Sequence, residues 1–250
     1  MDYSTLTAEQ IKAEMDKRYV SGQPYTLQIK WDIERMHDLN AKTLQLIGDI
    51  KGKRILEVCC GQGGTAAYLP PDTDFTGVEL SSEAVALAQR SFPEFTFLQG
   101  DASDLDMAEC AFDVVIAKEA IEHLLDQPAA VAEWYRVLKP GGCLVLTTPN
   151  RDSLHLRMNR LLGGADFKCS YDHTHELTFN ECVGLLGNAG FAVTEKRGSF
   201  LMPYWGVNGV DHRVRPLTDN NEECIAIFKA LGDAVPPEYS FCMVLKAVKA

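Results

Sequence analysis

The sharpest chemical signal in the sequence is a glycine turn in the run ILEVCCGQGG, which spans residues 55–64. Gly61, Gly63 and Ala66 satisfy the spacing G-x-G-x-x-G/A, after an apolar run and before an expected helix. Glycines at such a turn let a ligand approach the backbone, because no side chain stands in the way. The pattern predicts a nucleoside-binding turn. The alternative is a turn needed only for packing a strand against a helix.

An acidic residue, Glu79, ends the next apolar run about 20 residues after the turn. A carboxylate at that place can accept hydrogen bonds from both hydroxyl groups of a ribose. No arginine stands beside Glu79 to bind a 2′-phosphate. The turn and Glu79 together indicate a nucleoside, but they do not separate NAD from other nucleosides.

Two histidines in the stretch YDHTHELT are the candidate catalytic residues. His173 and His175 are two residues apart, so an extended backbone would place both on one face. An unperturbed imidazole titrates near neutrality, which suits a general base. Two alternatives stay open: a histidine that only orders its loop, and a metal site formed with Asp172. We expect no metal, because no further clustered ligand is visible in the sequence.

The stretch SFLMPYWGV offers Met202, Tyr204 and Trp205 as an aromatic wall for an organic substrate, or as ordinary lid packing. Three arginines before it have helical spacing: Arg151, Arg157 and Arg160. They are either a solvated helix face or a site for a carboxylate or phosphate group of the substrate. From these segments we predict Tyr204, Trp205 and Arg151 as substrate-binding residues.

The elements that must position these residues alternate between strand and helix. Five short apolar runs, RILEV, DFTGV, FTFLQ, DVVIA and CLVLTT, are separated by helical patterns. Runs so uniformly apolar are typical of strands covered on both faces, hence of a parallel sheet. The order predicts a doubly wound α/β fold. Two further strands are expected in FAVTEKRGSF and YSFCMVLKAV.

We expect two parts in the chain: an N-terminal helical cap over residues 1–50 and the main domain over 51–250. The cap should hold a helix over 7–20, which starts at a capping box of Thr7 and Gln10, and a second helix that ends near Gly48. In the main domain, Thr178 and Glu181 form another capping box. Lid insertions are expected near 151–177 and 200–238, the second with a helix over 222–231.

Composition narrows the class of protein. The 250 residues carry a formal net charge of −11, which argues against a nucleic acid or an anionic membrane as partner. The eight cysteines form no C-x-x-C pair, so we expect small buried thiols in a reducing compartment. No stretch approaches the roughly 20 apolar residues of a membrane span. These features predict a soluble cytoplasmic protein.

Five ordered motifs resemble those of class I S-adenosylmethionine-dependent methyltransferases. They are ILEVCCGQGG, GVELS, GDASDL, FDVVIAKEAIEHL and VLKPGGCLVLTTPN, and the similarity covers about residues 50–195. The nearest pattern is that of small-molecule enzymes of the ubiquinone-biosynthesis kind. The resemblance implies a Rossmann-like, seven-stranded sheet with an antiparallel last strand. It also implies S-adenosylmethionine as cofactor and methyl transfer to an oxygen, nitrogen or carbon atom of a small organic acceptor.

The resemblance also assigns roles to the cofactor-binding residues. Glu57 and the turn from Gly61 to Gly63 face the methionine end, and Glu79 holds the ribose. The remaining positions are Leu80, which packs on the adenine, Asp101 and Ala102, which recognise the adenine edge, and Lys118, which lies beside the amino-acid group. Carboxylates at positions 57, 79 and 101 suit a cationic sulfonium better than a pyrophosphate.

Three further residues are compared with family positions. Cys59 stands where the family usually has glycine, so its side chain crowds the turn. His175 matches a family histidine in a D-x-T-H stretch, and His123 resembles a position near the active site.

Two other functions stay open: a catalytically silent S-adenosylmethionine-binding module and an NAD-dependent oxidoreductase. The sequence leaves the oligomeric state open.

Overall fold

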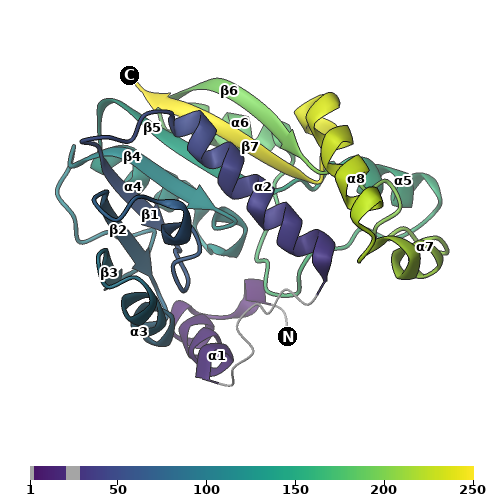
Figure 1. The fold of residues 1–250 in the computed structure, drawn as a ribbon, viewed down its shortest axis with the longest axis horizontal. Helices are drawn as coiled ribbons and strands as arrows, with labels where there is room; N and C mark the ends of the chain where they lie inside the picture. Colours follow the sequence, from purple (N-terminus) through teal and green to yellow (C-terminus); the bar gives the residue numbers. More distant parts are fainter. Residues whose placement is uncertain (1–2, 21–28) are drawn as a thin grey trace.

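One seven-stranded sheet forms the centre of the protein (Figure 1). The structure is a computed structural model, and it describes residues 3–20 and 29–250. The strands are β1 (Arg54–Val58), β2 (Asp74–Glu79), β3 (Thr96–Gln99), β4 (Phe112–Lys118), β5 (Leu138–Pro149), β6 (Phe191–Ser199) and β7 (Cys242–Lys249). Their order is β3-β2-β1-β4-β5-β7-β6. Strands β1 to β5 pair in parallel, and β7 runs antiparallel to β5 and β6. The predicted Rossmann-like sheet is confirmed.

Helices cover both faces of this sheet. They are α1 (Ala8–Val20), α2 (Lys30–Ile47), α3 (Ser82–Ser91), α4 (Gln127–Val137), α5 (Leu154–Leu161), α6 (Phe179–Asn188), α7 (Asp211–Thr218) and α8 (Glu222–Ala234). Short 3-10 turns are η1 (Tyr3–Thr5), η2 (Ala66–Tyr68), η3 (Ile121–His123) and η4 (Pro237–Tyr239). The element after the glycine turn is thus the brief η2 and not the expected α-helix, since Pro70 and Pro71 follow and cannot continue one.

The strand side chains divide the core into two layers. Leu56 lies in the cluster that holds Trp134 of α4, whereas its neighbour Ile55 lies in the cluster that holds Leu39 of α2 and Val85 of α3. Adjacent strand residues point to opposite faces, so uniformly apolar strands fill both layers. Helix α2 crosses the sheet over β5 and β7 (Figure 1), so it is part of the covering layer.

The predicted helix starts are found in the structure. Thr7 and Gln10 exchange backbone-to-side-chain hydrogen bonds at 2.9 and 3.3 Å before α1. Thr178 and Glu181 form the complete capping box of α6. Helix α2 ends before Gly48, whose φ of +72° favours glycine.

The two expected lid insertions contain more helix than predicted. Residues 154–161 form α5 and residues 211–218 form α7, and both lie with α8 beyond one end of the sheet (Figure 1). Asn159 of α5 accepts a hydrogen bond from the backbone N–H of Asn208 at 3.0 Å, which ties the two insertions together.

All eight cysteines are free. Four of them are buried, namely Cys60, Cys143, Cys182 and Cys242. The expectation of burial was wrong for Cys110, which is exposed, because it stands in a turn and not inside a strand. Among the described residues, no helix is both long and apolar enough to cross a membrane.

Candidate active site

A cavity of about 360 Å³ lies where β1, β2 and β4 end. In a parallel sheet these carboxyl ends share one edge, so side chains from distant parts of the sequence meet there. Eight of the predicted cofactor-binding residues line the cavity: Glu57, Cys59, Gly61, Glu79, Leu80, Asp101, Ala102 and Lys118. Gly63 does not line it, because it packs beneath the turn against Phe92 and Phe97.

The glycine turn is tightly left-handed. Gly61 has φ of +54° and Gly63 has φ of +86°. Cys59 has φ of +53°, although cysteine carries a Cβ that disfavours this region by about 1 kcal/mol. A glycine would suit position 59 without strain. The crowding that the sequence predicts at Cys59 thus takes the form of backbone strain, and Cys59 lines the cavity.

Glu79 supports the turn from the end of β2. Its two carboxylate oxygens accept hydrogen bonds from the backbone N–H groups of Gly61 and Ser81, each at 3.0 Å. Burial raises the pKa of Glu79, although these backbone N–H groups act in the opposite direction. Each oxygen still has a second lone pair for a ligand hydroxyl.

Glu57 lies at the end of β1 beside two polar partners. It accepts a hydrogen bond from Thr65, and its Oε1 lies 3.9 Å from Nζ of Lys118. Its Oε2 is buried with no hydrogen-bond partner in residues 3–20 or 29–250. Lys118 in turn donates to Asn40 of α2 at 2.6 Å. Burial raises the pKa of Glu57 and lowers that of Lys118.

The N-terminal helix α1 covers the glycine turn. Asp16 accepts a hydrogen bond from Ser81 at 2.5 Å, which joins α1 to the start of α3 (Figure 1). The Tyr19 hydroxyl lies 3.3 Å from the position that a Cβ on Gly61 would occupy. Burial and the nearby Glu79 raise the pKa of Tyr19. Helix α1 is thus a wall of the cavity, a role that the sequence did not reveal.

The part of the chain that forms this cavity edge, from β1 to β5, resembles known proteins. Residues 56–146 match a family model described as a methyltransferase domain. The chain is similar to a methyltransferase domain over these residues, which run from β1 into β5. This agrees with the seven-stranded sheet and its antiparallel β7. S-adenosylmethionine is the methyl donor of this family.

Relatives extend the comparison. A "Probable S-adenosylmethionine-dependent methyltransferase" of Mycolicibacterium smegmatis is 33% identical over 150 residues, which are 60% of this chain and 56% of that one. A fatty-acid O-methyltransferase of the same organism is 37% identical over 123 residues, 44% of each chain. The chain thus spans about half the length of the curated relatives it matches. A SAM-dependent methyltransferase structure from Thermotoga maritima has a TM-score of 0.64 at 20% identity, and it covers 95% of this chain and 99% of that one. At that identity the likeness shows the fold alone.

Beyond the cofactor side, the cavity is lined by a half-buried ion network. Arg35 of α2 donates to Glu119 at 2.6 Å and to Asp32 at 2.8 Å. Glu119 also accepts from Thr147 at 3.0 Å and has a left-handed φ of +49°. Strained backbone at this strand end holds the carboxylate toward the cavity. The sequence interpretation missed Glu119, although it directly follows Lys118 in the fourth motif.

The structure separates the predicted catalytic and substrate residues. His173 is buried and lines the cavity, whereas His175 is exposed and does not. Trp205 lines the cavity, but Tyr204 points its hydroxyl to Thr218 at 2.7 Å instead. The expectation that the two histidines share a face was wrong, because the loop bends there and is not extended.

Arg151 also lies outside the cavity, because it pairs with Glu181 of α6 at 2.9 Å. Arg157 and Arg160 both pair with Asp152. The three arginines therefore pair with carboxylates of the protein. Arg157 and Arg160 lie on α5, whereas Arg151 precedes this helix in a turn.

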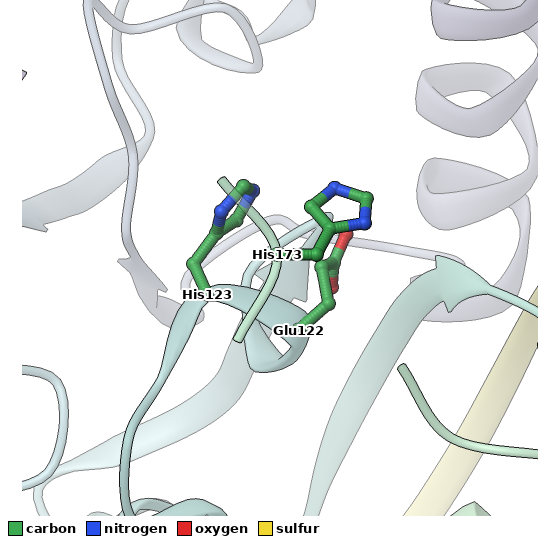
Figure 2. A group of neighbouring side chains, drawn as sticks. All are labelled: Glu122, His123 and His173. Carbon is green, nitrogen blue, oxygen red and sulfur yellow. The ribbon is translucent and has the colours of Figure 1, made fainter. Parts of the chain in front are cut away.

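His173 meets two residues of η3, Glu122 and His123, as Figure 2 shows. One side-chain ligand atom from each of the three lies within 4.8 Å of the others. Burial and the nearby Glu119 raise the pKa of Glu122 to about 8. The metal site that the sequence left open used Asp172, His173 and His175, but Asp172 pairs with Arg18 at 2.9 Å, and His175 is exposed and does not line the cavity.

Proposed function

We propose that this methyltransferase domain transfers a methyl group from S-adenosylmethionine to an oxygen, nitrogen or carbon atom of a small organic acceptor. One observation carries the proposal: Glu57, Glu79 and Asp101 come from three neighbouring strand ends and line one cavity beside the bare backbone of Gly61. A cationic sulfonium with ribose hydroxyl donors suits these carboxylates. The phosphates of NAD would be repelled by them.

The cofactor fits this chain at its unsatisfied polar atoms. We assign the ribose to Glu79, whose oxygens keep free lone pairs, and the ammonium group to the unpartnered Oε2 of Glu57. Lys118 supplies the positive charge for the amino-acid carboxylate. Leu80, Asp101 and Ala102 would hold the adenine, as the family resemblance implies.

When bound, S-adenosylmethionine supplies an electrophilic methyl group; its carbon–sulfur bond breaks, and the electron pair stays on sulfur. The chain must orient the acceptor in line, exclude water and receive the acceptor's proton. We place the acceptor's reacting atom beside Glu122, His123 and His173, because these groups line the cavity and His175 does not.

The acceptor end of the cavity favours a neutral or cationic molecule. Outside the residues assigned to the cofactor, four acidic side chains line the cavity against two arginines, Arg18 and Arg35. The acidic ones are Asp32, Glu119, Glu122 and Asp172. Arg35 already pairs with two carboxylates, so it is not available for an acidic acceptor. Trp31, Met36, Trp205 and Phe241 supply an aromatic and apolar wall for an organic ring.

The test is turnover of S-adenosylmethionine to S-adenosylhomocysteine with a panel of phenols, amines, quinols and fatty acids. We expect product with neutral or cationic acceptors and none with free fatty acids. Tight cofactor binding without turnover on any acceptor class would favour a catalytically silent binding module.

A further inference from the structure

The cluster of Glu122, His123 and His173 has the composition and the rigidity of a metal site. The rings of His123 and His173 lie 4.9 Å apart, and Figure 2 shows the carboxylate of Glu122 next to the ring of His173. The loop that carries His173 is fixed to η3, because Thr174 donates to the backbone oxygen of Glu122 from its N–H at 2.7 Å and from its hydroxyl at 2.9 Å. The hydroxyl also lies 2.7 Å from the backbone oxygen of Leu124. The three side chains are therefore held together by backbone contacts.

Each imidazole is oriented through its Nδ1. Nδ1 of His173 lies 2.5 Å from Oε1 of Glu176, which is fully buried, and Nδ1 of His123 lies 3.3 Å from the backbone oxygen of Asp172. Such partners hold Nδ1 as the protonated nitrogen and leave Nε2 as a lone-pair donor. This is the arrangement that metal-binding histidines show: a carboxylate or carbonyl behind the ring and a ligand in front of it.

The carboxylate of Glu122 gives a second, independent observation. Its side chain is 1% exposed, and its Oε2 accepts a hydrogen bond from Thr148 at 2.8 Å. Its Oε1 has no hydrogen-bond partner within the parts of the chain that the structure describes. A buried carboxylate oxygen without a partner is costly, and a cation between it and the two imidazoles would remove the cost.

We propose that Glu122, His123 and His173 bind one divalent transition-metal ion, such as Zn²⁺ or Mn²⁺. Two nitrogen ligands and one oxygen ligand suit these ions better than Mg²⁺ or Ca²⁺, which prefer oxygen alone. Three protein ligands leave coordination positions open on the cavity side. A hydroxyl oxygen of the acceptor can take one of them, and its pKa then falls, so that it releases its proton to solvent water near neutral pH. With the metal bound, the three side chains act as ligands and not as the proton acceptor. The metal site itself is independent of the proposed methyl transfer, whereas this role at the acceptor rests on it.

The first experiment measures metal binding directly on the full chain after dialysis against a chelator, without cofactor or acceptor. Mn²⁺ is followed by electron paramagnetic resonance, and Zn²⁺ by isothermal titration. We expect about one equivalent of metal with a dissociation constant at or below about 10 µM. His173→Ala and Glu122→Gln should weaken binding at least about 100-fold, and Glu176→Gln about tenfold through the lost orientation of His173.

The matched control is His175→Ala, which removes an exposed imidazole two residues away and should leave metal affinity unchanged. His123→Ala, at a half-buried position, is the second ligand variant in case Glu122→Gln does not fold. A wild-type chain that binds neither metal, or that binds both equally well without His173 and His123, would overturn the proposal.

A second readout concerns the acceptor. Co²⁺ in the site absorbs in the visible region, and we expect its bands to shift when a phenolic acceptor is added. Unchanged bands would remove the acceptor role and leave the site itself. Titration of the same variants with S-adenosylhomocysteine separates this inference from the proposed function, because the three ligands lie outside the cofactor-binding residues.

Discussion

The substitution Glu79→Gln should weaken cofactor binding by about 100-fold. In the structure, one carboxylate oxygen accepts the N–H of Gly61 and the other accepts the N–H of Ser81, both at 3.0 Å. Glutamine has a single oxygen, so its amide NH₂ must face one of these N–H donors. Glu79 is 2% exposed, and an unpaired buried donor there costs the fold about 1–3 kcal/mol.

The substitution should cost cofactor binding more free energy than it costs folding. Hydrogen bonds to a charged group contribute about 1.5–3 kcal/mol each, and glutamine removes the charge from both ribose bonds and the acceptor atom from one. A loss of about 3 kcal/mol follows, which corresponds to about 100-fold in dissociation constant. Isothermal titration with S-adenosylhomocysteine measures it, and a thermal melt confirms folding.

The control for this experiment is Glu83→Gln, which removes an exposed carboxylate from α3. Its affinity for S-adenosylhomocysteine should stay within about twofold of the wild type, because surface charges interact weakly across water. If folded Glu79→Gln bound as tightly as this control, Glu79 would not hold the ribose.

Three further predictions follow from the same geometry. Burial lowers the pKa of His155 to about 3, so the folded chain keeps it neutral, whereas the unfolded chain protonates it below about pH 6.5. The free energy of unfolding should therefore fall by about 3 kcal/mol between pH 7 and pH 4.5. Urea unfolding at these two pH values should show a decrease smaller by this amount in His155→Gln. Asp16→Ala removes the bond to Ser81 and should raise hydrogen exchange in α1 about tenfold, with no such rise in α4. Trp205→Ala should raise the KM for an organic acceptor on the order of tenfold and leave cofactor affinity unchanged; an altered cofactor affinity with unchanged KM would contradict its place at the acceptor end.

The sequence predicted the cofactor side of the cavity because its signals are local. The strand that carries Glu57, the turn at Gly61 and the acidic residue at position 79 are predicted from spacing and apolar runs alone. Parallel strands bring their carboxyl ends together, so the residues meet without further information. The fold class and strand pattern were predicted for the same reason.

The acceptor side could not be predicted in this way. His173 meets His123 although the two lie 50 positions apart in the chain, and only the bend of the loop decides that His173 faces inward while His175 faces solvent. Two-residue alternation assumes an extended backbone, which this loop lacks. Arg35 reaches Glu119 from α2 through a contact that no spacing indicates.

The bounds of α5 and the whole of α7 were missed, because neither helix has a clear apolar stripe, although Arg157 and Arg160 have helical spacing. Helix α7 contains Pro216 and has few buried residues, so its pattern is not helical. Helix α5 is short and rich in arginine, and its buried face consists of His155, Leu156 and Asn159. Tertiary packing on Trp205 and Phe241, and not helix propensity, stabilises this region.

The most direct test of the cofactor assignment is isothermal titration of the purified full chain with S-adenosylmethionine and, separately, with NAD. We expect one equivalent of S-adenosylmethionine to bind in the micromolar range and NAD to give no heat of binding. Tight binding of NAD with none of S-adenosylmethionine would contradict the assignment of Glu57, Glu79 and Asp101 to a sulfonium nucleoside.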